Sequence, residues 1–258
     1  MNPRPVSAAI ASLFLLLSPF DAVAGSTATA AITNVRFGVL DLTPGDGTAA
    51  GFAIGPVVPS LFAYLYAGTA DYYAAGYPGP LVPATVQLGL GGSSVSARTS
   101  GALADVASAT SGDSSLGIYG TAGGSANEAL HFRLRPHTVL TIDGHLSLLA
   151  ARAGASAQYY EAIGTAHVGI VDGNGYTATQ FARQSLSYAD WPDRMTIEDD
   201  FTLAFANGSA EERDVSVYFQ AVSTVTRIMP VPEPSSGALL CVGLLLLGLR
   251  SVSRRRAR

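Results

Sequence analysis

Residues 129–135 alternate between apolar and polar side chains, and this alternation constrains the fold more than any other feature of the chain. Because successive side chains of a β-strand point to opposite faces, a period of two predicts a strand with Leu130, Phe132 and Leu134 on a buried face. A second such strand is expected at residues 215–225, after a charged turn at 211–214. The sequence therefore indicates a protein built from sheets.

Further segments of β-type sequence are separated by residues that favour turns. We expect strands at residues 31–42, 61–67, 85–90, 138–143, 145–151, 159–171, 176–188 and 194–205. Turn formers fill residues 43–48 and 171–175, Asn207-Gly208 is typical of a hairpin corner, and Gly144 indicates a bend or bulge. Residues 91–127, rich in Ser, Gly, Thr and Ala, indicate weak order or a long surface excursion. The pattern predicts an all-β fold, an antiparallel β-sandwich of jelly-roll type.

Residues 1–24 have the parts of a secretory signal peptide. Arg4 and the amino terminus supply a weakly basic start, residues 8–17 are apolar, and Ala22-Val23-Ala24 forms a cleavage site before Gly25. The alternative, a retained N-terminal anchor, needs a longer apolar segment. We expect export by the Sec machinery and cleavage after Ala24, which leaves residues 25–230 as one extracytoplasmic β-sandwich domain.

Residues 231–258 also divide into three parts. Two prolines, Pro232 and Pro234, keep Glu233 on an extended backbone, and Ser235 and Ser236 complete this first part. An uncharged apolar run follows, and residues 237–253 approach the length of one short transmembrane helix. The basic end, 250–258, belongs on the cytoplasmic side; its arginines are Arg250, Arg254, Arg255, Arg256 and Arg258. The alternatives are an ordinary membrane anchor and a buried core helix with a basic end.

The order of these parts resembles the PEP-CTERM sorting tail of Gram-negative bacteria. In that family an exosortase, a membrane protease-transpeptidase, recognises and processes the tail during export. The resemblance implies that Val231, Pro232, Glu233 and Pro234 are recognition residues of a substrate. It also implies transient anchoring in the inner membrane, then a place at the cell surface or outside the cell, among exopolysaccharide.

The charge and cysteine content of the body limit the classes of partner that it can bind and the cross-links that it can form. Residues 25–230 hold nine arginines, no lysine and 17 acidic residues, a formal charge of −8. An acidic body argues against nucleic acid or an anionic membrane as its partner. The one cysteine, Cys241, lies in the apolar tail, so the body has no disulfide, and no cofactor is expected.

Candidate catalytic residues are few. The four histidines are His131, His137, His145 and His167, and they lie in none of the motifs of zinc proteases or serine hydrolases. His131 and His145 would face each other if residues 135–143 folded back as a hairpin, but solvent-facing histidines on strands are the favoured interpretation. The acidic run at 198–200 alternates faces in a strand, which favours a solvated charge run over a glycosidase pair. We therefore expect no enzyme.

Two other groups of residues have a binding interpretation. Asp172 and Asn174 offer oxygen ligands to calcium, as does Asp46, although the same residues are what a turn requires, and the turn interpretation is favoured. Exposed aromatic rings stack on sugars, so Tyr72, Tyr73 and Tyr77, in a Gly/Ala/Pro-rich loop, and Trp191 are possible glycan contacts. Packing is the alternative for all four, and Tyr64 and Tyr66 are expected in the core.

Two functions from different classes follow. The favoured one is a non-catalytic cell-surface or extracellular-matrix protein that an exosortase sorts and that associates with exopolysaccharide. The alternative is a secreted carbohydrate-binding protein or polysaccharide-active enzyme that uses the same sorting signal.

Overall fold

The computed structural model describes residues 25–154, 159–189 and 191–228. The predicted signal peptide, sorting motif, transmembrane segment and basic end lie outside these residues, except that Gly25 opens the first strand. The described residues belong to a unit that spans Met1–Ile228, and Met229–Arg258 form a second unit. In the described part of the chain, no helix combines the length and the apolar character needed to cross a bilayer.

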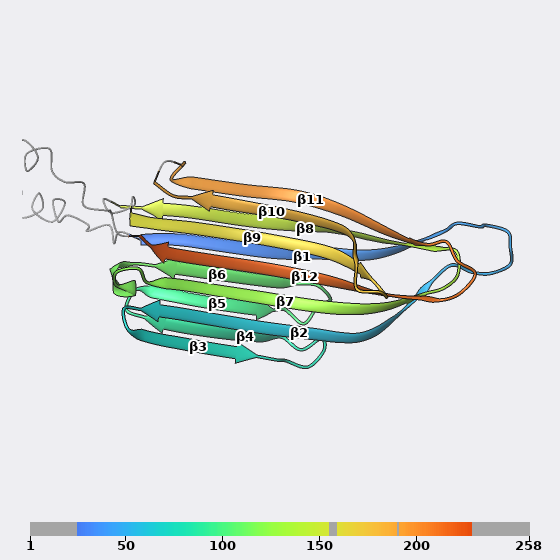
Figure 1. Ribbon diagram of the computed structural model, residues 1–258, viewed down its shortest axis with the longest axis horizontal. Coiled ribbons are helices and arrows are strands. Elements are labelled where there is room, and N and C mark those ends of the chain that lie inside the picture. The colour runs from blue at the N-terminus through green and yellow to red at the C-terminus, as the bar shows by residue number, and fades with distance from the viewer. Residues whose placement is uncertain (1–24, 155–158, 190, 229–258) are drawn as a thin grey trace, which may run out of the picture. The chain divides into compact units, whose positions relative to one another are not determined.

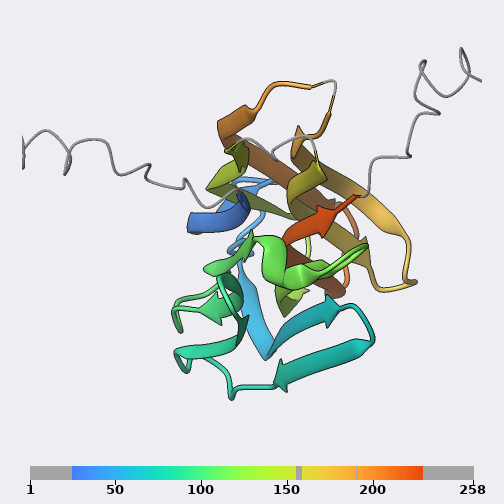
Figure 2. The same cartoon turned by 90° about the vertical axis from the view of Figure 1, so that its left-hand side faces the viewer.

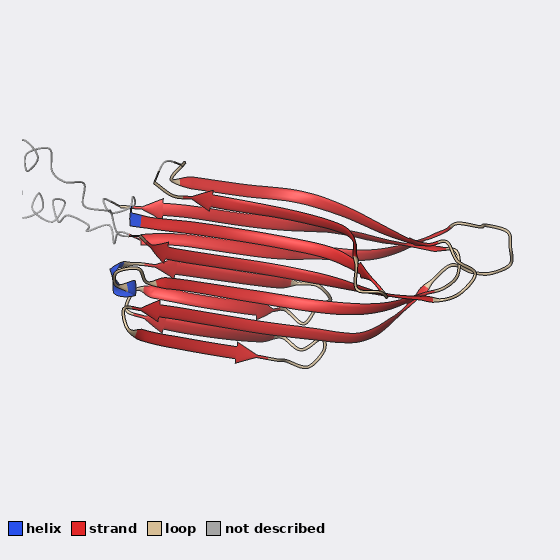
Figure 3. Ribbon diagram, viewed as in Figure 1, coloured by secondary structure: helices blue, strands red, loops and turns tan. Residues whose placement is uncertain are grey.

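Within the described residues, twelve strands form two six-stranded sheets whose strands run along the body, and most of these residues are strand (Figures 1 and 3). The first sheet has the order β11 (Arg194–Asn207), β8 (Thr138–Ala153), β1 (Gly25–Asp41), β6 (Val106–Gly112), β5 (Ser93–Thr99) and β4 (Ala84–Leu90). The second has the order β10 (Thr177–Ser187), β9 (Tyr160–Asp172), β12 (Arg213–Arg227), β7 (Thr121–Leu134), β2 (Phe52–Ala67) and β3 (Ala70–Gly76).

All neighbouring strands pair antiparallel, and the two sheets pack face to face, as the view along the strands illustrates (Figure 2). The predicted antiparallel β-sandwich is confirmed. Each predicted strand segment lies within an observed strand or overruns its end by a single residue. Leu130, Phe132 and Leu134 are at most 1% exposed, so the alternation identified the core face of β7 correctly.

The prediction for residues 91–127 is wrong, because this stretch supplies β5, β6, the 3-10 helix Ser114–Leu116 and half of β7. Small residues occupy its core-facing positions, as with Val95, Ala97 and Thr99 of β5. Side chains of this size let the two sheets approach closely, but their low hydropathy hides the period of two. Thr110 of β6 and Ser223 of β12 even pair their hydroxyls across the sheets, 2.7 Å apart.

Two turn predictions need correction. Asn207-Gly208 ends β11, but the chain then crosses to β12 in the other sheet, so the corner is not a hairpin. Asn207 is fully buried, and its Nδ2 donates to the carbonyl groups of Arg135 and Glu211 at 2.9 and 2.8 Å, which secures the crossover. The irregularity predicted at Gly144 does occur at this position of the β1–β8 pair, but the extra residue is in β1, between Thr33 and Arg36, and Gly144 itself lies inside β8.

Candidate functional site

Four aromatic side chains gather on the outer face of the second sheet. This aromatic group consists of Phe62, Tyr64 and Tyr66 on β2 and Tyr73 on β3, with ring centroids of neighbours 5.3 to 6.1 Å apart. Tyr73 lies directly opposite Tyr64 in the strand register. Contact between rings across a strand pair stabilises an arrangement that remains open to solvent on one side.

Two hydroxyl groups of this aromatic group hold each other in position through a hydrogen bond. Tyr73 Oη donates a hydrogen bond to Tyr66 Oη at 2.6 Å, which raises the pKa of Tyr73 to about 12. Tyr64 lies flat over Gly123 of β7, where a β-carbon would overlap its ring. Both contacts hold the rings in place, so little freedom is lost when a ligand stacks on them.

The expectation of Tyr64 and Tyr66 in the core is wrong. The alternate residues Leu61, Ala63 and Leu65 are at most 2% exposed and face the first sheet, so the tyrosines face outward. Residues 61–67 contain no charged or strongly polar side chain, so hydropathy could not identify the buried face. A tyrosine hydroxyl needs water or another polar partner, and the outer face supplies both.

The other predicted sugar contacts do not form one surface with this group. Tyr72 lies on β3 rather than in a loop, and it points to the opposite face from Tyr73, beside Leu65. Tyr77 follows β3 and is 81% exposed. Trp191 lies in the β10–β11 connection, and β10 and β3 are opposite edges of the sheet.

Trp191 is held by a buried cation that sequence analysis missed. The side chain of Arg152 on β8 is 3% exposed and donates to Ser187 Oγ at 3.0 Å and to Asp193 Oδ1 at 2.9 Å. It also donates to the carbonyl of Trp191 at 3.3 Å, while the Trp191 ring stacks on Tyr188. Arg152 therefore fixes the β10–β11 connection on the sandwich.

The histidines do not converge. His131 lies on β7 in the second sheet and His145 on β8 in the first, so the idea that they face each other is wrong. His145 instead lies between two acids of β11: Nδ1 is 2.7 Å from Asp200 and Nε2 is 2.9 Å from Glu198. Asp200 and then Glu198 raise the pKa of His145, while Ser147 and His145 lower that of Glu198.

Asp199 points to the other face of β11, as the alternation predicts, and pairs with Arg183 of β10 at 2.8 Å. The acidic run is therefore divided between two faces of the strand. Its two outward-facing residues, Glu198 and Asp200, both contact His145, whose imidazole lies between the two carboxylates.

The predicted calcium residues lie in the β9–β10 turn. Asp172 Oδ1 accepts from the backbone N–H groups of Asn174 and Tyr176, both at 3.0 Å, and Oδ2 accepts from Arg213 at 3.3 Å. The bond from Tyr176 is the main cause of the lowered pKa of Asp172. Within the described ranges, no group of three or more His, Cys, Asp or Glu side chains could hold a metal ion.

The described residues define a class, the antiparallel β-sandwich proteins, here with an aromatic group on the outer face of one sheet. Residues 230–256 match the family model of the PEP-CTERM protein-sorting motif. The chain thus carries this sorting motif where its sequence predicted it, and the motif implies export to the cell envelope or surface and processing by an exosortase. No curated protein has a detectably similar sequence.

Proposed function

We propose that this chain is a non-catalytic protein of the cell surface or extracellular matrix that associates with exopolysaccharide. The Sec machinery exports it, the tail holds it briefly in the inner membrane, and an exosortase then processes the tail. The observation that carries the proposal is the sorting motif at residues 230–256, together with a body that presents a fixed aromatic group in which Phe62 and Tyr73 are exposed.

The aromatic group supports the polysaccharide as partner. A sugar ring has apolar C–H faces and a rim of hydroxyls, and a tyrosine offers a flat apolar face with a polar tip. Phe62 and Tyr73 are 39% and 53% exposed, so a chain lying on the outer face of the second sheet can reach both rings. The acidic body adds no attraction for nucleic acid.

The arrangement of the outer acids supports a non-catalytic role over the alternative of a polysaccharide-active enzyme. A glycosidase needs two carboxyl groups about 5 to 10 Å apart with room between them for the sugar and, in inverting enzymes, water. His145 takes that room between Glu198 and Asp200. Incubation of the protein with its polysaccharide and measurement of new reducing ends test this point, and their appearance would favour the enzyme.

Sorting is tested in a host that contains the cognate exosortase. Wild type should lose its tail and leave the inner membrane, whereas Glu233→Ala should accumulate there uncleaved. Glu211→Ala, which removes an exposed acid of the body, is the matched control and should behave as wild type. Identical fates for wild type and Glu233→Ala would show that this motif does not direct sorting.

Association is tested by co-sedimentation with the extracellular polysaccharide of the producing bacterium. The double substitution of Tyr66 and Tyr73 by Ala should weaken binding, whereas Leu40→Ala, at an apolar side chain that is 59% exposed on β1 of the first sheet, should not. If wild type does not sediment with the polysaccharide, the association is refuted.

A further inference from the structure

A groove with a volume of about 650 Å³ lies on the second sheet, away from the aromatic group. Its floor is formed by β7 and β12, one wall by residues 53–56 of β2, and the other wall by the β9–β10 turn. The first wall rises where β2 departs from regular pairing with β7, between Ile54 and Val57. The volume is within the range of about 300–1,000 Å³ that ligand pockets have.

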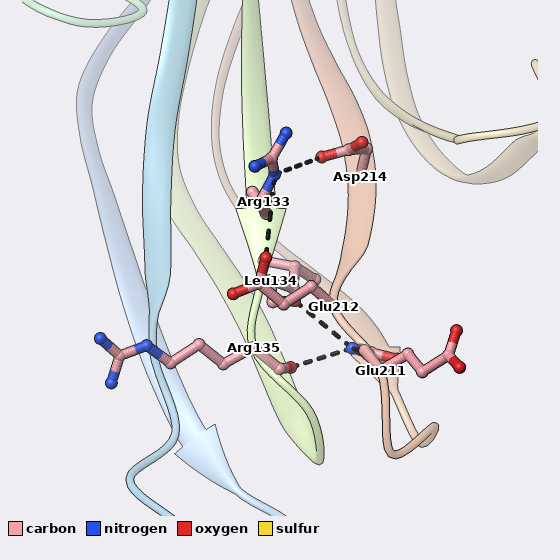
Figure 4. Close-up of polar contacts among 7 residues, drawn as sticks. Arg133, Leu134, Arg135, Glu211, Glu212 and Asp214 are labelled. Atoms are coloured by element: carbon pink, nitrogen blue, oxygen red, sulfur yellow. Dashed lines mark hydrogen bonds and ion pairs between the residues drawn. The ribbon is translucent and has the colours of Figure 1, made fainter.

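The floor of the groove carries two polar pairs, each between residues directly opposite in the β7–β12 register. His131 Nδ1 and Ser216 Oγ are 2.8 Å apart. Arg133 Nε donates to Asp214 Oδ1 at 3.2 Å, and Figure 4 shows the two side chains pointing toward each other from neighbouring strands. The pairs are successive on the same face of both strands, so the floor offers four polar side chains side by side.

Several atoms of this floor keep hydrogen-bonding capacity for a ligand. Among the described residues, the terminal nitrogens of Arg133, Nε2 of His131 and Oδ2 of Asp214 have no hydrogen-bond partner. Arg133 can only donate and the Asp214 carboxylate can only accept, whereas a sugar hydroxyl does both. A ligand with neighbouring hydroxyls can therefore use both side chains at once.

The charges around the groove are already paired. Arg133 has Asp214 at 3.2 Å and Glu212 at 4.0 Å, and Asp172 in the turn has Arg213 at 3.3 Å. An anionic ligand would meet the carboxylates that accompany Arg133, and a cationic one would meet the arginines. A neutral ligand meets neither repulsion and keeps the ion pairs intact.

We propose that this groove binds a neutral sugar unit of a polysaccharide, with Arg133 and Asp214 on its hydroxyls and the apolar wall at residues 53–56 against its ring. The inference rests on the proposed association with polysaccharide and names the place and the chemical class of the unit that is bound. The aromatic group is on another part of the same sheet, so one chain of sugars can contact both.

The test uses the extracellular polysaccharide of the producing bacterium, separated by anion exchange into neutral and acidic fractions. Wild-type protein should bind the neutral fraction in affinity electrophoresis, and Arg133→Met should bind it about tenfold more weakly, because donors to the hydroxyls are lost. Arg183→Met is the matched control, since it removes a half-exposed arginine from the Arg183–Asp199 pair on other strands, and it should bind as wild type.

A second variant tests the pairing of charges. Asp214→Asn removes the nearest carboxylate from Arg133, so it should lose affinity for the neutral fraction and gain affinity for the acidic one. If Arg133→Met and Asp214→Asn both bind the neutral fraction as well as wild type does, the groove is not the binding site. The proposed association with polysaccharide would still stand. Failure of wild type to bind either fraction overturns both, and wild-type preference for the acidic fraction overturns the assignment of a neutral sugar.

Discussion

Replacement of Gly164 by alanine tests how closely the two sheets of the sandwich approach. Gly164 lies on the inner face of β9, and a β-carbon there would lie 2.5 Å from the carbonyl oxygen of Thr29 in β1. It would also lie 3.2 Å from the carbonyl oxygen of Leu149 in β8. Both oxygens belong to the backbone of the first sheet, so no side-chain rotation relieves the overlap, and the sheets must separate locally.

The expected cost follows from the rigidity of these neighbours. Overpacking a core by one methyl group typically costs about 1–3 kcal/mol, and contact with two backbone oxygens places Gly164→Ala near the upper end, at about 3 kcal/mol. For a domain of this size, each kcal/mol corresponds to about 2–4 °C in Tm. The melting temperature should therefore fall by roughly 6–12 °C.

The assay is denaturant unfolding of the purified protein, followed by circular dichroism, with Gly208→Ala as the control. A β-carbon on Gly208 has no atom within 4 Å, so that variant should change the free energy of unfolding by less than about 0.5 kcal/mol. If Gly164→Ala is as stable as Gly208→Ala, the two sheets do not meet at this glycine and the reasoning fails.

Four other predictions concern buried and charged groups. Burial raises the pKa of Glu128, so the folded state holds its proton more tightly and stability falls as pH rises above about 4.5; Glu128→Gln should remove that slope in unfolding titrations. Because Asp200 and Glu198 raise the pKa of His145, protonated His145 stabilises the folded state below pH 6.5, and this stabilisation is lost as pH rises through the folded pKa. The variant His145→Gln should not show that loss. Asn207→Ala leaves buried carbonyls without a donor and should lower the free energy of unfolding by about 3 kcal/mol. Arg152→Met should release Trp191, the one tryptophan, and red-shift its fluorescence; an unchanged spectrum would contradict the anchor.

Most strands could be predicted because a period of two is a local property of the chain. The strands that were missed, such as β5 and β6, have the same period, but Ser, Ala and Thr occupy both faces and carry little hydropathy contrast. Their small side chains are explained only by the opposite sheet, which lies too close for larger ones. At Gly124, for example, a β-carbon would lie 2.9 Å from the carbonyl oxygen of Ser96.

The candidate sites were predictable only in part. The cluster of tyrosines near residues 64–77 is visible in the sequence, and alternation correctly places Tyr64 and Tyr66 on one face. Which face is buried depends on the packing of β2 against the first sheet, so the prediction failed there. The separation of Trp191 from these tyrosines could not be predicted either, because the order of strands within a sheet is not a local property of the sequence.

The sequence alone determined the sorting tail and most of the strands, because both depend on neighbouring residues along one chain. A sorting signal of this kind is a linear motif, so all the residues that form it are consecutive in the sequence. Only the tertiary structure decided which distant segments meet. His131 and Ser216 are 85 positions apart and share the floor of a groove, because β7 and β12 pair in one register among many that the alternation permits. That choice depends on the summed packing of both sheets, which no single segment contains.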